Sequence, residues 1–439
     1  MKVLKFGGTS VGSAQRMKDV AKLITDGEQK IVVLSAMSGT TNTLVEISDY
    51  LYKKNPEGAN EVINKLEAKY KHHIDELFST EEYKQKTLEF VKSVFDYIRS
   101  FTKDIFTLFE EKVILAQGEI ISTNMVTNYL CEQGVKAVLI PALEFMRTDK
   151  NSEPDLNYIR EKLALQLEAN PGQEIYITQG FICRNAYGEI DNLQRGGSDY
   201  TASLIGAAVN ASEIQIWTDI DGMHDNDPRV VDKTSPVRQL HFEEAAELAY
   251  FGAKILHPTC VQPAKYANIP VRLLNTMEPS APGTLISNET EKGKIKAVAA
   301  KDNITAIKIK SSRMLLAHGF LRKVFEIFES YQTPIDMVCT SEVGVSMSID
   351  NTKHLNEIVN DLKKYGTVTV DHDMCIVCVV GDLEWENIGF EAKAIQAMRN
   401  IPVRMISFGG SNYNISFLIR ESDKKTALQS LSDVLFNNK

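Results

Sequence analysis

The first fifty residues alternate between short apolar runs, glycine-rich turns and amphipathic stretches. Val3–Phe6 and Ile31–Ser35 have the character of strands, and apolar positions three and four apart predict a helix over Ala14–Thr25 between them. The small-residue loop Ala36–Asn42 follows the second strand and leads into a helix from about Leu44. Repeats of strand, loop and helix predict a parallel sheet with helical crossovers.

The pattern changes between residues 53 and 112, where charged residues and helix formers dominate. Glycine is absent after Gly58 within this stretch, and apolar residues recur at helical spacing. We expect an excursion of two or three helices here. The pair His72-His73 inside it predicts solvated helix histidines rather than a metal site, because adjacent residues on a helix do not face one site.

The α/β pattern then resumes as far as a polar stretch, Glu278–Lys294, that is rich in Pro, Gly, Ser and Thr. This stretch is the predicted end of a first domain, 1–294. The expected elements between are the helices Val113–Cys131, Asp199–Val209 and Glu243–Tyr250 and the strands Ala137–Pro141, Ile175–Thr178 and Ile214–Thr218, and the segment Pro270–Asn275 closes the unit.

The last third of the chain contains an internal repeat. Gly319 and Gly389 each precede an amphipathic helix, and each helix is followed by two strands, Pro334–Val338 with Val345–Ile349 and Pro402–Ile406 with Ile415–Ile419. The repeat predicts two βαββ units, 302–373 and 374–439.

The strand count of these units is uneven. Ile295–Ala300 and Ile304–Ile309 both precede the first helix, whereas the second unit ends in the helix Lys424–Phe436 without a final strand. We therefore expect Ile295–Ala300 to complete the sheet of the second unit.

The composition of the chain argues against several classes of function. The 439 residues include 49 Lys and Arg against 58 Asp and Glu, a net charge of −9, and this acid excess argues against a nucleic-acid surface. The longest apolar run, Met374–Val380, is far shorter than the roughly 20 residues of a membrane span. No secretory signal is visible at the N-terminus. We expect a cytoplasmic protein that binds neither nucleic acid nor a membrane.

The six cysteines do not predict a disulfide framework, because the chain is neither short nor evidently secreted. Cys375 and Cys378 have the spacing of half a zinc site, but they lie inside the apolar run Met374–Val380. We interpret them as core thiols and predict no metal site in the chain.

Two glycine-rich turns at strand–helix junctions carry candidate chemistry. In Lys5-Phe6-Gly7-Gly8 the glycines let the backbone approach an anion, and Lys5 adds a charge that suits a transferring phosphoryl group. The second turn, Arg195–Asp199, offers a planar fork for a carboxylate at Arg195. Asp199 is also a favourable residue at the start of any helix, because its charge suits the helix N-terminus. For the first turn, spacing alone is equally compatible with a tight turn in which Lys5 is solvated.

Two further segments contain candidate ligand-binding residues, but each indicates a site only together with the glycine-rich turns. Thr218-Asp219 ends a strand, at the edge where open α/β sheets bind ligands. Glu119 lies in the helix after Gln117-Gly118, and alone it would be a surface acid.

Taken in order, these motifs closely resemble those of the aspartate kinases, which are members of the amino acid kinase family. Thr178–Phe181, Trp217–Asp219 and Phe251–Pro258 fit the same pattern, and the C-terminal repeat is similar to the paired ACT domains of that family. The resemblance implies a three-layer α/β/α kinase domain with a mainly parallel sheet, followed by two ferredoxin-like α+β ACT domains.

The resemblance also implies an activity and its residues. ATP would phosphorylate the β-carboxylate of L-aspartate, with Mg²⁺ bridging phosphate oxygens, as the first step of lysine, threonine and methionine biosynthesis. Lys5 would stabilise the transferring group and Asp199 would orient Lys5. The residues implied to hold aspartate are Ser35, Thr41, Glu119, Arg195 and Ser198. Those implied to contact the nucleotide are Lys5, Gly7, Gly8, Thr218, Asp219, Arg229 and Lys254. His224 departs from the family pattern, which has Tyr there.

Regulation is expected in the first ACT unit. Gly319 begins a helix whose N–H groups suit a carboxylate, and Asp336 and Glu342 are acids that suit an ammonium group, although both are also ordinary surface acids by type. We expect feedback inhibition by an amino acid, with L-lysine the leading candidate, in a homodimer or higher homo-oligomer formed through ACT domains. The candidate effector residues are Met314, Gly319, Phe320, Leu321, Asp336, Ser341 and Glu342.

Two alternatives stay open. Another amino acid kinase would act on acetylglutamate, glutamate, carbamate or UMP, and an inactive kinase fold would serve only as an amino acid sensor. The presence of Lys5, Arg195 and Asp199 argues against the sensor.

Overall fold

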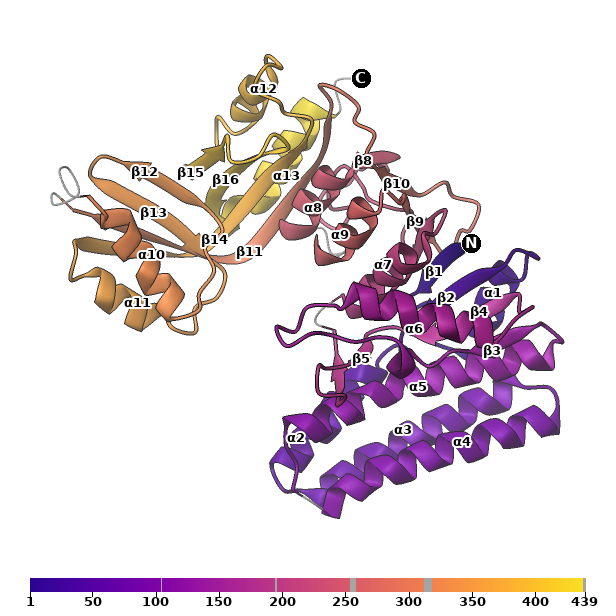
Figure 1. Cartoon of the computed structure of the whole chain (residues 1–439). Coiled ribbons are helices and arrows are strands. Elements are labelled where there is room, and N and C mark those ends of the chain that lie inside the picture. Colours follow the sequence, from indigo (N-terminus) through magenta and orange to yellow (C-terminus); the bar gives the residue numbers. More distant parts are fainter. Residues whose placement is uncertain (104, 194–195, 253–257, 312–317, 437–439) are drawn as a thin grey trace. The chain divides into compact units, whose positions relative to one another are not determined.

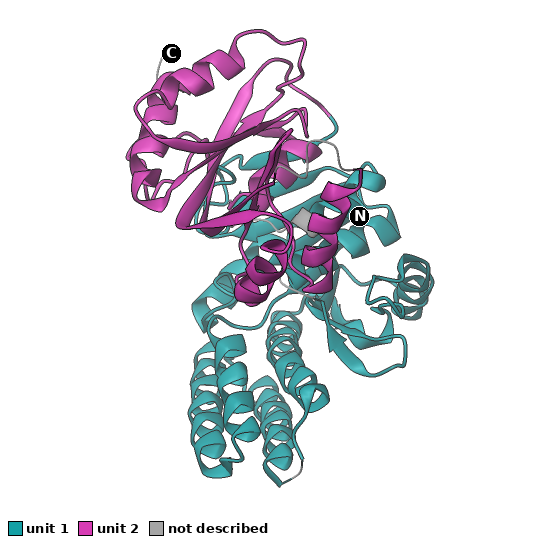
Figure 2. Ribbon diagram, turned by 90° about the vertical axis from the view of Figure 1, so that its left-hand side faces the viewer, with its two compact units in different colours: residues 1–223, 255–288 teal, residues 224–254, 289–439 magenta. Residues whose placement is uncertain are grey.

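The computed structural model describes residues 1–103, 105–193, 196–252, 258–311 and 318–436 of the chain. They form two compact units, one of residues 1–223 with 255–288 and one of residues 224–254 with 289–439 (Figure 2). The predicted first domain, 1–294, therefore includes residues 224–254, which the structure places in the second unit.

The first unit is built on a sheet whose strands lie in the order β3-β4-β2-β1-β7-β9-β10. Neighbouring strands are parallel except for the pair β9–β10. Every residue of β2 and β4 is buried, as a sheet covered on both faces requires. The strands are β1 (Lys2–Phe6), β2 (Lys30–Leu34), β3 (Ala137–Leu139), β4 (Ile175–Gln179), β7 (Ile214–Thr218), β9 (Val271–Asn275) and β10 (Thr284–Ser287).

Helices cover both faces of this sheet (Figure 1). Leu4, Phe6, Val32 and Leu34 share a hydrophobic core with one group of helices, namely α1 (Ala14–Ile24), α2 (Thr40–Tyr52) and α5 (Leu108–Glu132). On the other face α7 (Gly197–Val209) contacts β1, β2 and β7, and it packs against α6 (Leu156–Ala169) and α9 (Pro258–Tyr266). A short hairpin of β5 (Ile182–Arg184) and β6 (Ile190–Asn192) lies beside α5. The predicted three-layer architecture is confirmed.

The expected helical excursion consists of α3 (Pro56–Leu77) and α4 (Glu81–Ser100), followed by one 3₁₀ turn, Phe101–Lys103. Both helices contribute to the same core as α2 and α5, which they contact. His72 is exposed as expected. The side chain of His73 is only 14% exposed, so the prediction of two solvated histidines is wrong for His73, and burial lowers its pKa.

The second unit contains an antiparallel sheet in the order β12-β13-β11-β14-β16-β15. Its strands are β11 (Ile295–Lys310), β12 (Val338–Ser341), β13 (Gly344–Ile349), β14 (Thr367–Gly381), β15 (Val403–Phe408) and β16 (Asn414–Arg420). One core cluster holds α10 (Phe320–Ser330) and α11 (Leu355–Leu362), and another holds α12 (Phe390–Ala397) and α13 (Lys424–Leu435). The unit also includes β8 (Gln239–His241) and α8 (Phe242–Tyr250), and α8 contacts β11 and β14.

Two predicted strand boundaries are wrong in this unit. Ile295–Ala300 and Ile304–Ile309 are one continuous strand, β11, with register shifts on either side of Ile304. The predicted strand Pro334–Val338 begins only at Val338. Ile295–Ala300 pairs with Val377–Gly381, as the uneven strand count predicts. The predicted boundary at 373/374 falls inside β14, so β11 and β14 each serve both halves of the repeat.

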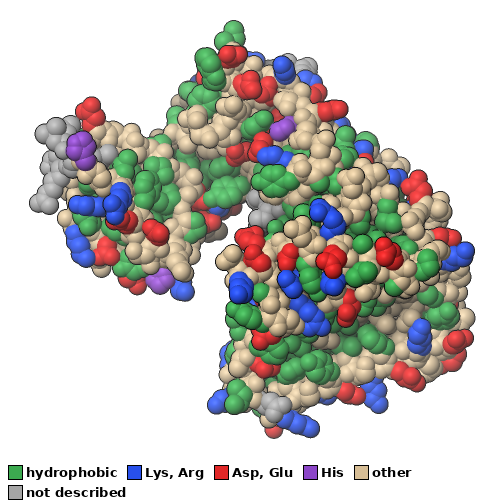
Figure 3. Space-filling view, in the orientation of Figure 1, with side chains coloured by type: hydrophobic (Ala, Val, Ile, Leu, Met, Phe, Trp, Pro, Cys, Tyr) green, Lys and Arg blue, Asp and Glu red, His purple; other side chains and the backbone are tan. Residues whose placement is uncertain are grey.

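Cys375 and Cys378 lie fully buried in β14 and form no disulfide. Burial raises the pKa of both thiols, so they stay protonated and unreactive, as expected of core thiols. None of the described helices combines the length and the apolar character that crossing a membrane would take. On the face shown in Figure 3, acidic and basic side chains are interspersed rather than separated by sign.

Candidate active site

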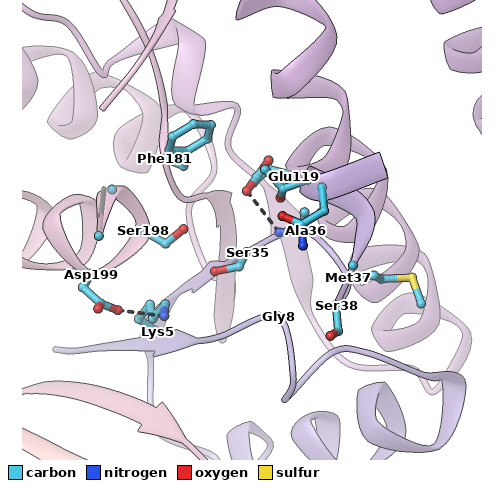
Figure 4. Close-up of a pocket in the computed structure, with 15 residues that line it drawn as sticks. Lys5, Gly8, Ser35, Ala36, Met37, Ser38, Glu119, Phe181, Ser198 and Asp199 are labelled. Carbon is cyan, nitrogen blue, oxygen red and sulfur yellow. Dashed lines mark hydrogen bonds and ion pairs between the residues drawn. The ribbon is translucent and has the colours of Figure 1, made fainter. Parts of the chain in front are cut away.

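A cavity of about 380 Å³ lies in the first unit, where the two glycine-rich turns come together (Figure 4). Residues predicted from the sequence supply part of its wall, namely Lys5, Gly8, Ser35, Thr41, Glu119, Ser198 and Asp199. The remaining lining residues, which the sequence did not single out as site residues, are Ala36, Met37, Ser38, Gly39, Asn42, Phe181, Gly196 and Gly197. All of these except Phe181 belong to the sequence segments Ala36–Asn42 and Arg195–Asp199, and membership of these small-residue segments is the signal by which they are recognisable.

Lys5 and Asp199 form an ion pair at one end of the cavity (Figure 4). Lys5 is in β1 and Asp199 in the first turn of α7, and their Nζ and Oδ1 atoms are 2.7 Å apart. Each side chain is about one-eighth exposed (12% and 13%), so the pair is shielded from water yet open to a ligand. A partly buried carboxylate of this kind fixes the direction of a flexible lysine.

The first glycine turn lies directly against the loop after β2. A Cβ atom on Gly8 would be 2.9 Å from the carbonyl oxygen of Ala36, closer than such atoms approach. The carbonyl of Gly8 accepts a hydrogen bond of 3.1 Å from the amide of Ser38. Any side chain at position 8 would therefore separate the two walls of the cavity.

Glu119 is a buried acid rather than a surface one, with 4% of the residue exposed. Its Oε1 accepts a hydrogen bond of 3.2 Å from the amide of Ala36, and within the described part of the chain its Oε2 has no hydrogen-bond partner. Burial raises the pKa of Glu119 to about 8. A buried carboxylate oxygen without a partner is costly unless a ligand satisfies it, and an ammonium group would do so.

The opposite wall is formed where Gly180 and Phe181 meet the start of α7. A Cβ atom on Gly180 would lie 2.6 Å from the side chain of Ser198. Phe181 has a left-handed backbone conformation, with φ of 70°, although it is a bulky residue. Strain of this kind costs about 1–3 kcal/mol and is concentrated at functional sites.

Of the predicted nucleotide contacts, Lys5 and Gly8 line the cavity, whereas Gly7, Thr218 and Asp219 are not among its lining residues. Thr218 is the last residue of β7 in the first unit, and Asp219 follows it. Arg229 belongs to the second unit, where its guanidinium binds both carboxylate oxygens of Asp227 at 2.9 and 2.8 Å. Lys254 and the predicted aspartate contact Arg195 lie outside the described residues.

His224, at which the sequence departs from the family pattern, belongs to the second unit. Its Nδ1 lies 3.0 Å from the hydroxyl of Thr234, within the second unit.

The effector candidate Asp336 has a cationic partner within the chain. Its side chain is 2% exposed, and its Oδ1 lies 2.7 Å from the ammonium of Lys301 and accepts a hydrogen bond of 2.9 Å from the hydroxyl of Tyr250. The interpretation of Asp336 as a surface acid is therefore wrong, and its Oδ1 is not open to a second ammonium group. Among the described residues its Oδ2 is buried without a partner.

The other effector candidates are scattered around the start of α10 and the end of β12. Gly319 precedes α10 with φ of 83°, Phe320 is buried and Leu321 is 38% exposed. Ser341 ends β12 and Glu342 follows in the turn, whereas Met314 lies outside the described residues. No cluster of three or more His, Cys, Asp or Glu side chains suited to a metal ion occurs within the described ranges.

The profile of the amino acid kinase family matches residues 1–275, and that of an ACT domain matches residues 377–435. The chain therefore belongs to the amino acid kinase family. Aspartokinase 1, chloroplastic, of Arabidopsis thaliana is 34% identical over an alignment of 458 positions, and this alignment covers 99% of this chain and 80% of that protein.

Solved structures give the same result. The crystal structure of E. coli aspartokinase III in complex with aspartate and ADP (R-state) is 31% identical, has a TM-score of 0.86, and the match covers 99% of this chain and 100% of that one. The same enzyme in complex with lysine and aspartate (T-state) is 32% identical, with a TM-score of 0.80 and coverage of 99% of both chains. Within the amino acid kinase family the chain is an aspartokinase.

Proposed function

We propose that this chain transfers the γ-phosphoryl group of ATP to the β-carboxylate of L-aspartate, giving 4-phospho-L-aspartate and ADP, and that the cavity around Lys5 is where it does so. The observation that carries the proposal is the Lys5–Asp199 ion pair opposite Glu119, whose Oε2 has no hydrogen-bond partner among the described residues. The end of the cavity at Lys5 suits a phosphoryl group, and the end at Glu119 suits an ammonium group. Aspartate carries both an ammonium group and a carboxylate that can accept a phosphoryl group.

The proposed roles follow from charge. Lys5 cancels the negative charge that develops on the transferring group, and Asp199 keeps the Lys5 ammonium in place during the step. Glu119, when ionised, binds the α-ammonium group of aspartate. The hydroxyls of Ser35, Thr41 and Ser198 and the guanidinium of Arg195 would hold the carboxylates, and Thr218, Asp219, Arg229 and Lys254 would contact the nucleotide.

The chemical step needs no general base. The β-carboxylate of aspartate is ionised at neutral pH, so one of its oxygens attacks the γ-phosphorus directly while the bond from that phosphorus to the β–γ bridging oxygen breaks. ADP leaves with the electron pair. We propose that Mg²⁺ enters with ATP as the counter-ion of its phosphates, where it reduces their charge. The protein contributes positioning and a preorganised positive charge.

A coupled assay for ADP release tests the proposal, with hydroxylamine added to trap an acyl phosphate as the hydroxamate. We expect activity with L-aspartate and none above background with glutamate, N-acetylglutamate, carbamate or UMP. ADP release with one of these acceptors instead of aspartate would indicate another amino acid kinase. Loss of hydroxamate in Asp199→Asn would exclude a contaminating kinase, and no activity with any acceptor would favour the sensor.

We further propose that an amino acid end product inhibits the enzyme through its ACT domains and that these domains assemble a homo-oligomer. The match of an ACT profile to residues 377–435 supports regulation of this kind, and the complex of E. coli aspartokinase III with lysine makes L-lysine the first effector to test. Activity should be measured with lysine and threonine separately and together, and mass in solution by light scattering with and without each.

A further inference from the structure

The helical excursion, to which the family resemblance assigns no role, contacts the wall of the substrate cavity at two points. This wall is the segment of residues 36–42, which consists of the loop after β2 and the first three residues of α2. The hydroxyl of Tyr70, in α3, lies 2.8 Å from the hydroxyl of Thr40. One residue earlier in α3, the ammonium of Lys69 donates a hydrogen bond of 3.1 Å to the carbonyl of Ser38.

The contact between Tyr70 and Thr40 is shielded from water, because each residue is 1% exposed. A buried hydroxyl requires a hydrogen-bond partner, and these two hydroxyls supply one to each other. The residues on either side of Thr40, Gly39 and Thr41, both line the cavity. The position of the cavity wall at this point is therefore tied to α3.

The loop is held from two sides. Its beginning is fixed by α5, where Glu119 accepts the hydrogen bond from Ala36 and the hydroxyl of Ser122 donates one of 2.8 Å to the carbonyl of Ser35. Its end lies at the start of α2, where Gly39 has φ of 82° and offers no side-chain cap. A helix start that lacks a cap depends on other contacts for its position, and α3 provides them.

We propose that Tyr70 is a positioning residue for the aspartate site, which acts through Thr40 to hold Gly39 and Thr41 where they contact the substrate. The proposal rests on the proposed function, since it takes aspartate to be the molecule bound in the cavity. It assigns the excursion a role in substrate affinity in addition to its contribution to the core. Lys69 supports the same loop from the solvent side.

The first test compares Tyr70→Phe with the wild type. The ring stays in the core and the Thr40 hydroxyl is left without a partner, so the loop should shift. We expect the KM for aspartate to rise about tenfold, which corresponds to about 1.4 kcal/mol, while kcat and the KM for ATP stay within about twofold. Tyr83→Phe is the matched control, because Tyr83 is a partly buried tyrosine of α4 against the same core, and it should change neither KM.

The second test is a double-mutant cycle with Thr40→Val. The double variant Thr40→Val/Tyr70→Phe has no unpartnered hydroxyl, so its KM for aspartate should return to within about threefold of the wild-type value. If Tyr70→Phe lowers the Tm but leaves the KM for aspartate unchanged, the contact contributes only to stability, and the proposal is overturned. Equal rises in both KM values, or no recovery in the double variant, would also overturn it.

Hydrogen exchange separates this proposal from the proposed function. Amides of residues 38–42 should exchange faster in Tyr70→Phe than in the wild type and in Tyr83→Phe, whatever the acceptor substrate proves to be. A wild type that does not phosphorylate aspartate would refute the proposed function alone. Unchanged exchange in this loop would refute the positioning role alone.

Discussion

Glu119 should make the reaction depend on pH in a way that few carboxylates do. Burial raises its pKa to about 8, so at pH 7 only about a tenth of the molecules with an empty site carry the ionised form that pairs with an ammonium group. If only that form binds aspartate, kcat/KM for aspartate should fall about tenfold for each pH unit below 8. Between pH 8.5 and pH 6 the loss should be on the order of a hundredfold.

The assay is initial-rate kinetics with saturating ATP, from pH 6 to pH 8.5, for the wild type and for Glu119→Gln. The glutamine carbonyl still accepts the hydrogen bond from the amide of Ala36, so the variant isolates the charge. Its kcat/KM should be low and nearly independent of pH, and any slope that it retains belongs to other groups. A flat wild-type profile, or the same slope in both proteins, would refute the assignment of Glu119 to the ammonium group.

Stability provides a second measurement on the same pair of proteins. The pKa of Glu119 is higher in the folded state than the ordinary value of 4.5, so between these values the folded state binds more protons than the unfolded state. The free energy of unfolding should therefore fall as the pH rises from about 5 to 8, by on the order of a few kcal/mol more in the wild type than in Glu119→Gln. Parallel stability profiles for the two proteins would contradict the raised pKa.

Three other variants test the remaining assignments. Lys5→Ala should lower kcat by about 10²–10³-fold while circular dichroism stays that of the wild type, because the lost charge acts mainly in the transition state; near-native kcat would exclude this role. Ser198→Ala should raise the KM for aspartate and leave the KM for ATP unchanged, and equal changes would mean that its hydroxyl does not contact aspartate. Lys301→Met leaves Asp336 buried without its closest cation, so urea titration should show a loss of about 3–5 kcal/mol, against about 1 kcal/mol for Tyr250→Phe. If lysine inhibits by binding at Asp336, Lys301→Met should also lower the lysine concentration needed for inhibition, and an unchanged concentration would place the effector elsewhere.

The local sequence predicts the helices and strands of the fold and also the two glycine-rich turns that carry Lys5 and Asp199. Strand Lys2–Phe6 is short and apolar, Gly7 and Gly8 follow it, and α7 begins after a second glycine turn. The turns that follow parallel strands lie at the same edge of the sheet. For this reason the sequence predicts that Lys5 and Asp199 come close together, although they are almost 200 positions apart. The helical excursion was predictable for the same reason, because its apolar residues repeat with the helical period.

Strand continuity in the second unit was decided by contacts from far along the chain. The polar residues Lys301, Asp302 and Asn303 interrupt an apolar pattern, which is the sequence signal for a turn. In the folded protein Lys301 is paired with Asp336 and Asp302 with Lys424, at 2.7 and 2.6 Å. With both charges neutralised by distant partners, the backbone continues as a single strand.

Burial was likewise decided by tertiary structure at the substrate cavity. Gly118 brings α5 against the loop after β2, since a Cβ atom there would lie 2.8 Å from the side chain of Ala36, and this approach buries the neighbouring Glu119. Tyr70 has the helical spacing of an ordinary core residue, and nothing local marks its hydroxyl as the partner of Thr40. A sequence specifies which side chains a helix turns inward, but the polar groups that they meet come from other elements, and it is those groups that set the charge and position of the site.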